Sequence, residues 1–111
     1  MSLFNHPGLL EIRLRTWGLE TYKRVFLINK DDVVSIDAIR SPRILNIETG
    51  EYCEDDLVRF VELNILDSTG TIHSFRQEYD REEPTEMAHN SVASEVYSAI
   101  TSVAPHSIIA F

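Results

Sequence analysis

Cysteine is nearly absent from this sequence, which contains Cys53 alone among its 111 residues. One cysteine cannot form a disulfide within the chain, and a structural zinc site needs about four Cys, His or carboxylate ligands at regular spacing. The histidines are scattered without such spacing, at His6, His73, His89 and His106. We therefore expect a reducing, cytoplasmic setting, with no metal site and no cofactor.

Glycine and long apolar runs are also scarce. The four glycines lie too far apart to form a loop that cradles phosphate, so the sequence gives no support for nucleotide binding. The longest apolar runs, such as residues 25–28, are far shorter than the roughly 20 residues of a membrane-spanning helix. The N-terminus lacks a basic region followed by an apolar stretch. We expect neither a membrane span nor a secretory signal.

The overall composition is that of an ordinary globular protein. Of the residues, 43 % are hydrophobic and 25 % are charged, which argues against disorder. The chain shows no repeat and no linker rich in glycine, serine or proline. We expect a single domain over residues 1–111, which is long enough to bury one core.

Negative charge dominates and is unevenly placed. The net charge is −8; residues 1–43 carry seven basic and five acidic side chains, whereas residues 44–111 carry three and thirteen. Folding either mixes these charges over the surface or leaves an acidic face that attracts a basic partner. Direct nucleic-acid binding is not expected, because it depends on clustered Lys and Arg. The basic residues that lie close together are Arg13, Arg15, Lys23 and Arg24.

Alternation of apolar and polar residues, the period of a half-buried strand, recurs through the first half of the chain. The third alternating segment places Val34, Ile36 and Ala38 on one face. The strands predicted in this half are residues 10–15, 22–28, 33–39 and 44–47.

A hairpin is predicted in the second half. Residues 57–66 alternate clearly, residues 67–70 end in a glycine that can adopt positive φ, and residues 71–77 return as the partner strand. The apolar side chains that face one way on the first strand are Val61, Leu63 and Ile65.

A C-terminal helix follows an acidic loop. It is predicted to begin near Asn90 or Ser91, to be widened by Tyr97 and Ala99 and to end before Pro105. We expect Val96 and Ile100 to be among its most buried residues. The apolar stripe that must face the sheet consists of Val92, Val96, Ile100 and Val103.

The element order predicts an α+β fold: an antiparallel meander of five to six strands, forming a bent sheet or a partly open barrel, covered by the one helix. The tail 107–111 is apolar. It either folds back as a last strand or packs beside the helix in a monomer, or it forms the interface of a homodimer.

The chain resembles small flagellar FlbD-type proteins and related phage open reading frames over roughly residues 25–103. The element order also resembles that of pleckstrin-homology-like domains. Both resemblances imply a binding or scaffold module rather than an enzyme, and the first implies a phage-encoded protein as one origin. This sequence departs from the FlbD-type pattern at residues 42–56 and 78–86. It rests on Asn29, Asp31, Val33 and Ile36, the turn at 67–70, and Ser91, Val92, Glu95, Val96 and Ile100.

The expected function is non-catalytic binding or assembly through contacts with a protein partner or with a second copy. No residue is assigned a catalytic role, and acidic neighbours of Cys53 disfavour its nucleophilic thiolate form. The alternative is a small enzyme whose site combines His73, His89 and loop carboxylates. The candidate partner-binding residues form a strand face, an acidic cluster and an apolar tail: Arg13, Arg15 and Trp17; Glu54, Asp55 and Asp56; Ile108, Ile109 and Phe111.

Overall fold

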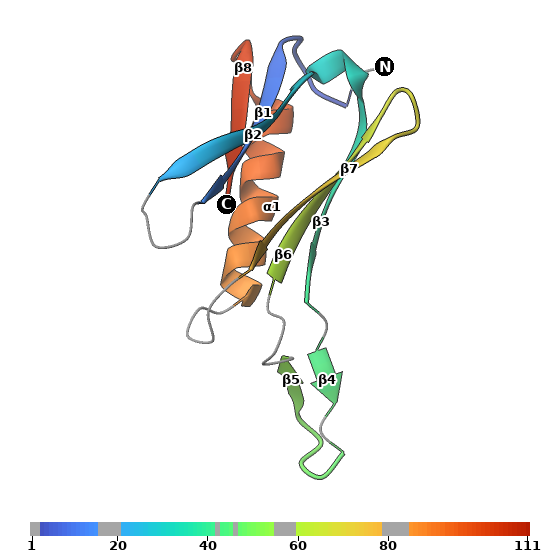
Figure 1. Cartoon of the computed structure of the whole chain (residues 1–111), viewed down its shortest axis with the longest axis vertical. Helices are drawn as coiled ribbons and strands as arrows, with labels where there is room; N and C mark the ends of the chain where they lie inside the picture. The colour runs from blue at the N-terminus through green and yellow to red at the C-terminus, as the bar shows by residue number, and fades with distance from the viewer. Residues whose placement is uncertain (1–2, 16–20, 42, 46, 55–59, 79–84) are drawn as a thin grey trace.

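A computed structural model describes residues 3–15, 21–41, 43–45, 47–54, 60–78 and 85–111. The class is α+β, as predicted, with one α-helix, α1, at Thr85–Thr101 (Figure 1). A single 3-10 turn, η1, spans Lys30–Asp32. The strands are β1 (Leu9–Arg15), β2 (Tyr22–Asn29), β3 (Val33–Arg40), β4 (Arg43–Leu45), β5 (Tyr52–Glu54), β6 (Phe60–Asp67), β7 (Ile72–Glu78) and β8 (His106–Ala110).

The strands form separate sheets rather than one continuous meander. Two sheets have three strands each, in the orders β2-β1-β8 and β3-β6-β7, and β4 pairs with β5. All pairs are antiparallel except β1 with β8, which is parallel. This arrangement differs from the single meander that the sequence predicts, because β8 pairs with β1 and does not extend the β3-β6-β7 sheet. The β4–β5 hairpin projects away from the two main sheets (Figure 1).

The β6–β7 hairpin forms where the alternation predicts it. The three apolar residues of β6 are fully buried, and the turn residue Gly70 has a φ of 86°. The Asp67 carboxylate accepts hydrogen bonds from the backbone N–H groups of Thr69 and Thr71, which fixes the turn. The buried residues of β6 are Val61, Leu63 and Ile65.

The face of β3 differs from the prediction at one residue. Val34 is exposed, whereas Val33 is buried and Ile36 and Ala38 pack against the core. The register with β6 shifts between Val33 and Ser35, so that one extra residue is accommodated there. Such a bulge reverses the inward and outward positions on its two sides, and simple alternation cannot anticipate it.

Helix α1 begins earlier than predicted, at Thr85 rather than near Asn90, because the helix formers Met87 and Ala88 extend it toward its N-terminus. Its most buried residues are Val92 and Ala99, and not Val96 and Ile100, which are only partly buried against the core. Two residues assigned to the apolar stripe are exposed. Val103 lies beyond the end of the helix, and Tyr97 faces outward.

The helix contacts β8, β3 and β6, and thus lies against both main sheets (Figure 1). His89 Nε2 lies 2.8 Å from the carbonyl oxygen of Ala38, on the edge of β3 that does not pair with β6. The Glu95 carboxylate receives the backbone N–H of Ala110 in β8. One helix therefore covers backbone groups at the edges of two different sheets.

The apolar tail, residues 107–111, packs against the rest of the chain. Ile109 and Phe111 are core residues, whereas Ile108 faces outward. The entry to β8 is tightly packed against the N-terminal segment: Gly8 has a φ of 141°, and a Cβ at this position would lie 2.1 Å from the carbonyl oxygen of Pro105. The tail thus adopts the alternative in which it folds back as a last strand.

Candidate functional site

Strand β2 forms an edge of its sheet, and among the described residues it pairs only with β1. The Lys30 N–H donates to the Gly8 carbonyl oxygen at 2.9 Å, and this register continues into the strands. Ile28 and Phe26 therefore direct their backbone groups toward β1, and the intervening Leu27 presents its N–H and C=O to the open edge. Only alternate residues of this eight-residue strand thus offer backbone groups to the open side, and the β1–β2 register shifts opposite Ile12 and Arg13.

The side chains along this edge are unusually apolar for exposed positions. The residues Tyr22, Val25 and Leu27 are 50 %, 43 % and 43 % exposed. Lys23 and Arg24 are also exposed, so that the strand combines apolar side chains with positive charge. Exposed edges of this length are normally blocked by charge, proline or a covering element, because they template pairing with another chain.

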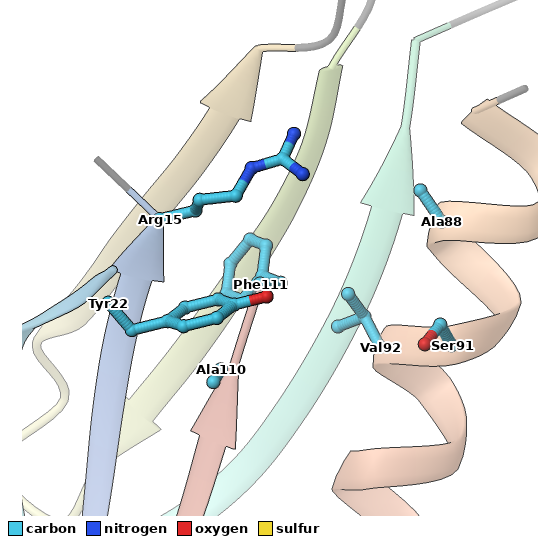
Figure 2. Close-up of a pocket in the computed structure, with 7 residues that line it drawn as sticks. All are labelled: Arg15, Tyr22, Ala88, Ser91, Val92, Ala110 and Phe111. Carbon is cyan, nitrogen blue, oxygen red and sulfur yellow. The ribbon is translucent and has the colours of Figure 1, made fainter. Parts of the chain in front are cut away.

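A pocket of about 190 Å³ lies at the Tyr22 end of β2. Figure 2 shows residues of β1, β2 and β8 on one side of this pocket and residues of α1 on the other. Arg15 and Tyr22 are partners in the β1–β2 register, and both line the pocket, which thus contains a guanidinium and a phenol. The lining residues are Arg15, Tyr22, Ala88, Ser91, Val92, Ala110 and Phe111.

A second cavity, of about 350 Å³, lies toward the other end of β2. It is bounded by β2, η1, the β6–β7 turn and β7. The Phe26 ring packs against two rings of β7, with centroids 4.6 Å from His73 and 5.1 Å from Phe75. The lining residues are Phe26, Leu27, Ile28, Asp32, Asp67, Ser68, Thr69 and His73.

Asp67 and His73 form the polar pair of this cavity. Asp67 Oδ2 lies 2.8 Å from His73 Nε2, and Oδ1 accepts a hydrogen bond of 2.6 Å from the Thr69 hydroxyl. Hydrogen bonds from the Thr69 hydroxyl and from His73, joined by the backbone N–H groups of Thr71 and Thr69, hold the pKa of the Asp67 carboxyl well below its usual range. Asp67 is therefore an anion that orients the imidazole.

Arg13, one of the predicted partner-binding residues, contacts Glu11 on the outer face of β1. Burial raises the pKa of the Glu11 carboxyl, but the hydrogen bond and charge of Arg13, together with His106 and Arg24, outweigh it and lower that pKa. His106 Nε2 lies 3.4 Å and Arg24 Nη1 lies 3.8 Å from Glu11 Oε1. Arg13 is thus held by an acidic neighbour and does not stand alone as a cation.

The structure distributes the other predicted residues over several regions. Arg15 lines the pocket at Tyr22, and Ile108 is exposed beside α1, whereas Ile109 and Phe111 are buried within the chain. Glu54 ends β5, and its side chain lies outside the described part of the structure. Trp17, Asp55 and Asp56 also lie outside the described residues.

The two histidines proposed for an enzyme site are not brought together. His89 contacts the Ala38 carbonyl oxygen, while His73 pairs with Asp67 at the β6–β7 turn. Sequence reasoning treated Asp67 as a turn residue and missed it as the partner of His73. The available signal was the predicted hairpin itself. Its antiparallel register brings His73, six positions after Asp67, back beside the turn.

No known protein family, characterised protein or solved structure matches the chain. The resemblances to FlbD-type proteins and to pleckstrin-homology-like domains therefore remain predictions. No helix in the described ranges is long and apolar enough to cross a membrane. Within the same ranges, no group of three or more His, Cys, Asp or Glu side chains is placed to hold a metal ion.

Proposed function

We propose that this chain is a non-catalytic binding module that takes up an extended segment of a protein partner along β2. The observation that carries the proposal is the outer edge of this strand, which pairs with no strand other than β1 in the described part of the chain. This edge has outward Leu27 backbone groups and exposed apolar side chains. A segment added to such an edge gains main-chain hydrogen bonds, and its alternate side chains supply specificity. The single cysteine fits a reducing, cytoplasmic setting for this module.

The chemistry of β2 defines the segment that would suit it. The exposed Lys23 favours an acidic partner, while the exposed Val25 and Leu27 favour apolar side chains. The two cavities, one lined by Tyr22 and one by Leu27, lie at opposite ends of the strand. They are suited to accept anchoring side chains from the two ends of the bound segment.

The test is a selection from a phage-displayed library of random peptides, followed by direct binding measurements. We expect enriched peptides that alternate apolar and acidic residues and that bind the intact chain. Leu27→Pro removes the outward N–H without touching the ladder to β1, and it should abolish binding. The matched control, Leu27→Ala, keeps that N–H and should retain most of the affinity. Equal binding by both variants would place the partner elsewhere.

A second copy of the chain is the other occupant that this edge would accept, since one strand used twice makes a two-fold antiparallel pair. Sedimentation equilibrium distinguishes this case from uptake of a foreign segment. A dimer that is lost in Leu27→Pro and kept in Leu27→Ala would assign the edge to self-association. A monomer at all concentrations would leave the edge to a protein partner.

A small enzyme is the second candidate function, favoured by the Asp67–His73 pair facing a cavity. An aspartate that orients an imidazole is half of the arrangement used for general-base catalysis. Hydrolysis of 4-nitrophenyl acetate provides a simple measurement. A rate lost in both His73→Gln and Asp67→Asn but retained in His89→Gln would favour the enzyme. A rate equal to that of free imidazole would exclude this chemistry.

A further inference from the structure

A groove of about 310 Å³ separates α1 from β8, on a different side of the sheet from the β2 edge. Its lining contains one carboxylate, three hydroxyls and one imidazole, with Ala99 and Ile108 as apolar surface. The imidazole is that of His106, whose Nε2 is directed to Glu11 at 3.4 Å. The Ser102 Oγ already accepts the backbone N–H of Ala104 at 3.0 Å. The polar residues that remain for a ligand are Glu95, Ser98 and Ser107.

Ser107 supplies the first sign that the groove is built for a ligand. The residue is 6 % exposed, and its hydroxyl has no hydrogen-bond partner in the described structure. A buried hydroxyl without a partner costs free energy, so native structures satisfy nearly all such groups through protein, water or ligand. The Ser107 Oγ is itself covered by neighbouring atoms, and a change of its rotamer would bring this unmade hydrogen bond to the groove that Ser107 lines.

The backbone of β8 supplies the second sign. The Leu9 N–H donates to the Pro105 carbonyl oxygen at 2.8 Å, and the Phe111 N–H donates to the Arg13 carbonyl oxygen at 3.1 Å. Odd-numbered residues of β8 thus face β1, and Ile108 turns its N–H and C=O toward α1. The groove gains a carbonyl oxygen from this edge.

Glu95 supplies the charge. Burial raises the pKa of this carboxyl, and the Ala110 N–H opposes that rise by stabilising the anion. Among the described residues, no lysine or arginine pairs with Glu95. A partly buried carboxylate in a groove that is also lined by serines is an acceptor-rich environment, and it lacks a cation among the described residues.

We propose that this groove binds a primary aliphatic ammonium group. An ammonium carries three N–H donors and one positive charge, which match the Glu95 carboxylate, the Ser107 hydroxyl and the Ile108 carbonyl oxygen. Its methylene stem fits the apolar surface of Ala99 and Ile108. The source is either a free amine or a lysine side chain, and the two share this chemistry.

The test is a titration of the intact chain, followed by ¹H–¹⁵N correlation spectra, with two amine probes. The first probe is 1-butylamine and the second is Nα-acetyl-lysine methylamide. We expect saturable shifts of the Ser107, Ile108 and Ala110 amides with both probes. Tighter binding of 1-butylamine would assign the groove to free amines, and tighter binding of the lysine derivative would assign it to a lysine of a partner.

Three variants test whether Glu95 and Ser107 bind the ammonium group. Glu95→Gln removes the charge but keeps an acceptor for the Ala110 N–H, and it should weaken binding roughly tenfold or more. Ser107→Ala should weaken binding several-fold without lowering the melting temperature, because it removes a hydroxyl that has no partner among the described residues. The control, Glu62→Gln, removes a carboxylate that pairs with Arg76 on the other sheet and should leave binding unchanged.

Two results would overturn the proposal. Tetramethylammonium carries the charge without any N–H donor, so equal shifts with this ion would reduce the effect to general attraction by an acidic protein. Shifts that never saturate, or that fall equally in Glu95→Gln and Glu62→Gln, would have the same meaning. If Glu95→Gln fails to fold, Ser107→Ala decides the question, since unchanged binding in that variant contradicts the assignment.

Discussion

Lys30 donates a hydrogen bond from Nζ to the carbonyl oxygen of Ala104 at 3.0 Å, although the two residues lie 74 positions apart in the chain. The Lys30 side chain is fully buried, and its ammonium lies 5.5 Å from the centroid of the Phe4 ring. This contact joins η1, at the end of β2, to the segment between α1 and β8. The Lys30 side chain thus connects the end of β2 to the start of β8, the two outer strands of the β2-β1-β8 sheet.

Replacing this lysine should therefore be costly. Lys30→Ala removes the hydrogen bond and the buried methylenes together, and we expect the free energy of unfolding to fall by about 2–4 kcal/mol. The exposed Lys23 on β2 is the control, and Lys23→Ala should change this free energy by less than about 0.5 kcal/mol. Urea denaturation of both variants measures the difference. Equal effects would mean that the buried contact contributes nothing to stability.

Gly8 should not tolerate a side chain. Its positive φ and the approach of Pro105 leave no space for a Cβ, so Gly8→Ala should destabilise the protein by roughly 2–4 kcal/mol. Gly50 also has a positive φ, of 72°, but nothing lies within 4 Å of its added Cβ. Gly50→Ala should therefore cost only about 1 kcal/mol. Thermal melting of the two variants separates the close approach from the backbone effect.

The helix should be most sensitive to truncation at Val92. Val92→Ala empties space that the core fills, and we expect a loss of about 2 kcal/mol in the free energy of unfolding. Tyr97 lies on the same helix but is 70 % exposed, and Tyr97→Ala should have little effect. Chemical denaturation provides the comparison. A larger loss at Tyr97 would show that the exposed face of α1 is covered in solution.

Asp67 should make stability depend on pH in the acidic range. Its carboxyl has a lowered pKa in the folded protein, so the stabilisation is present above its ordinary pKa of 3.8 and is lost as the pH falls further. Asp67→Asn should be less stable than the unaltered protein near neutral pH, and the difference should shrink below that ordinary pKa. Urea denaturation over this pH range tests the trend. A gap that stays constant on acidification would contradict it.

The hairpin and the helix were predictable because their signals are local. Alternation in β6 and a glycine in the turn determine the pairing with β7 without help from the rest of the chain. The bulge at Val34 carries no such signal, since the extra residue is defined only by the register with β6. The partner of β8 was equally hidden, because a parallel pair between distant segments leaves no trace in either one.

The candidate site was less predictable than the fold. Arg15 was singled out for its neighbours on one strand, yet the pocket it lines depends on Tyr22 and on α1. The open edge of β2 is a property of sheet order, and sheet order follows from long-range pairing. The alternating strands indicated that an edge must exist somewhere, but they could not identify which strand would form it.

The parallel pairing of β1 with β8 also has a consequence for synthesis. The partners of β1 residues Leu9 to Arg13 are synthesised almost one hundred positions later, at His106 to Ala110. A chain emerging from the ribosome can close the β6–β7 hairpin early, but the first sheet stays incomplete until Ile109 has left the exit tunnel. Pairing over such a separation is slow because the loop must close first. During that interval β1 exposes both its apolar side chains and an unpaired edge, and the nascent protein is then most vulnerable to aggregation.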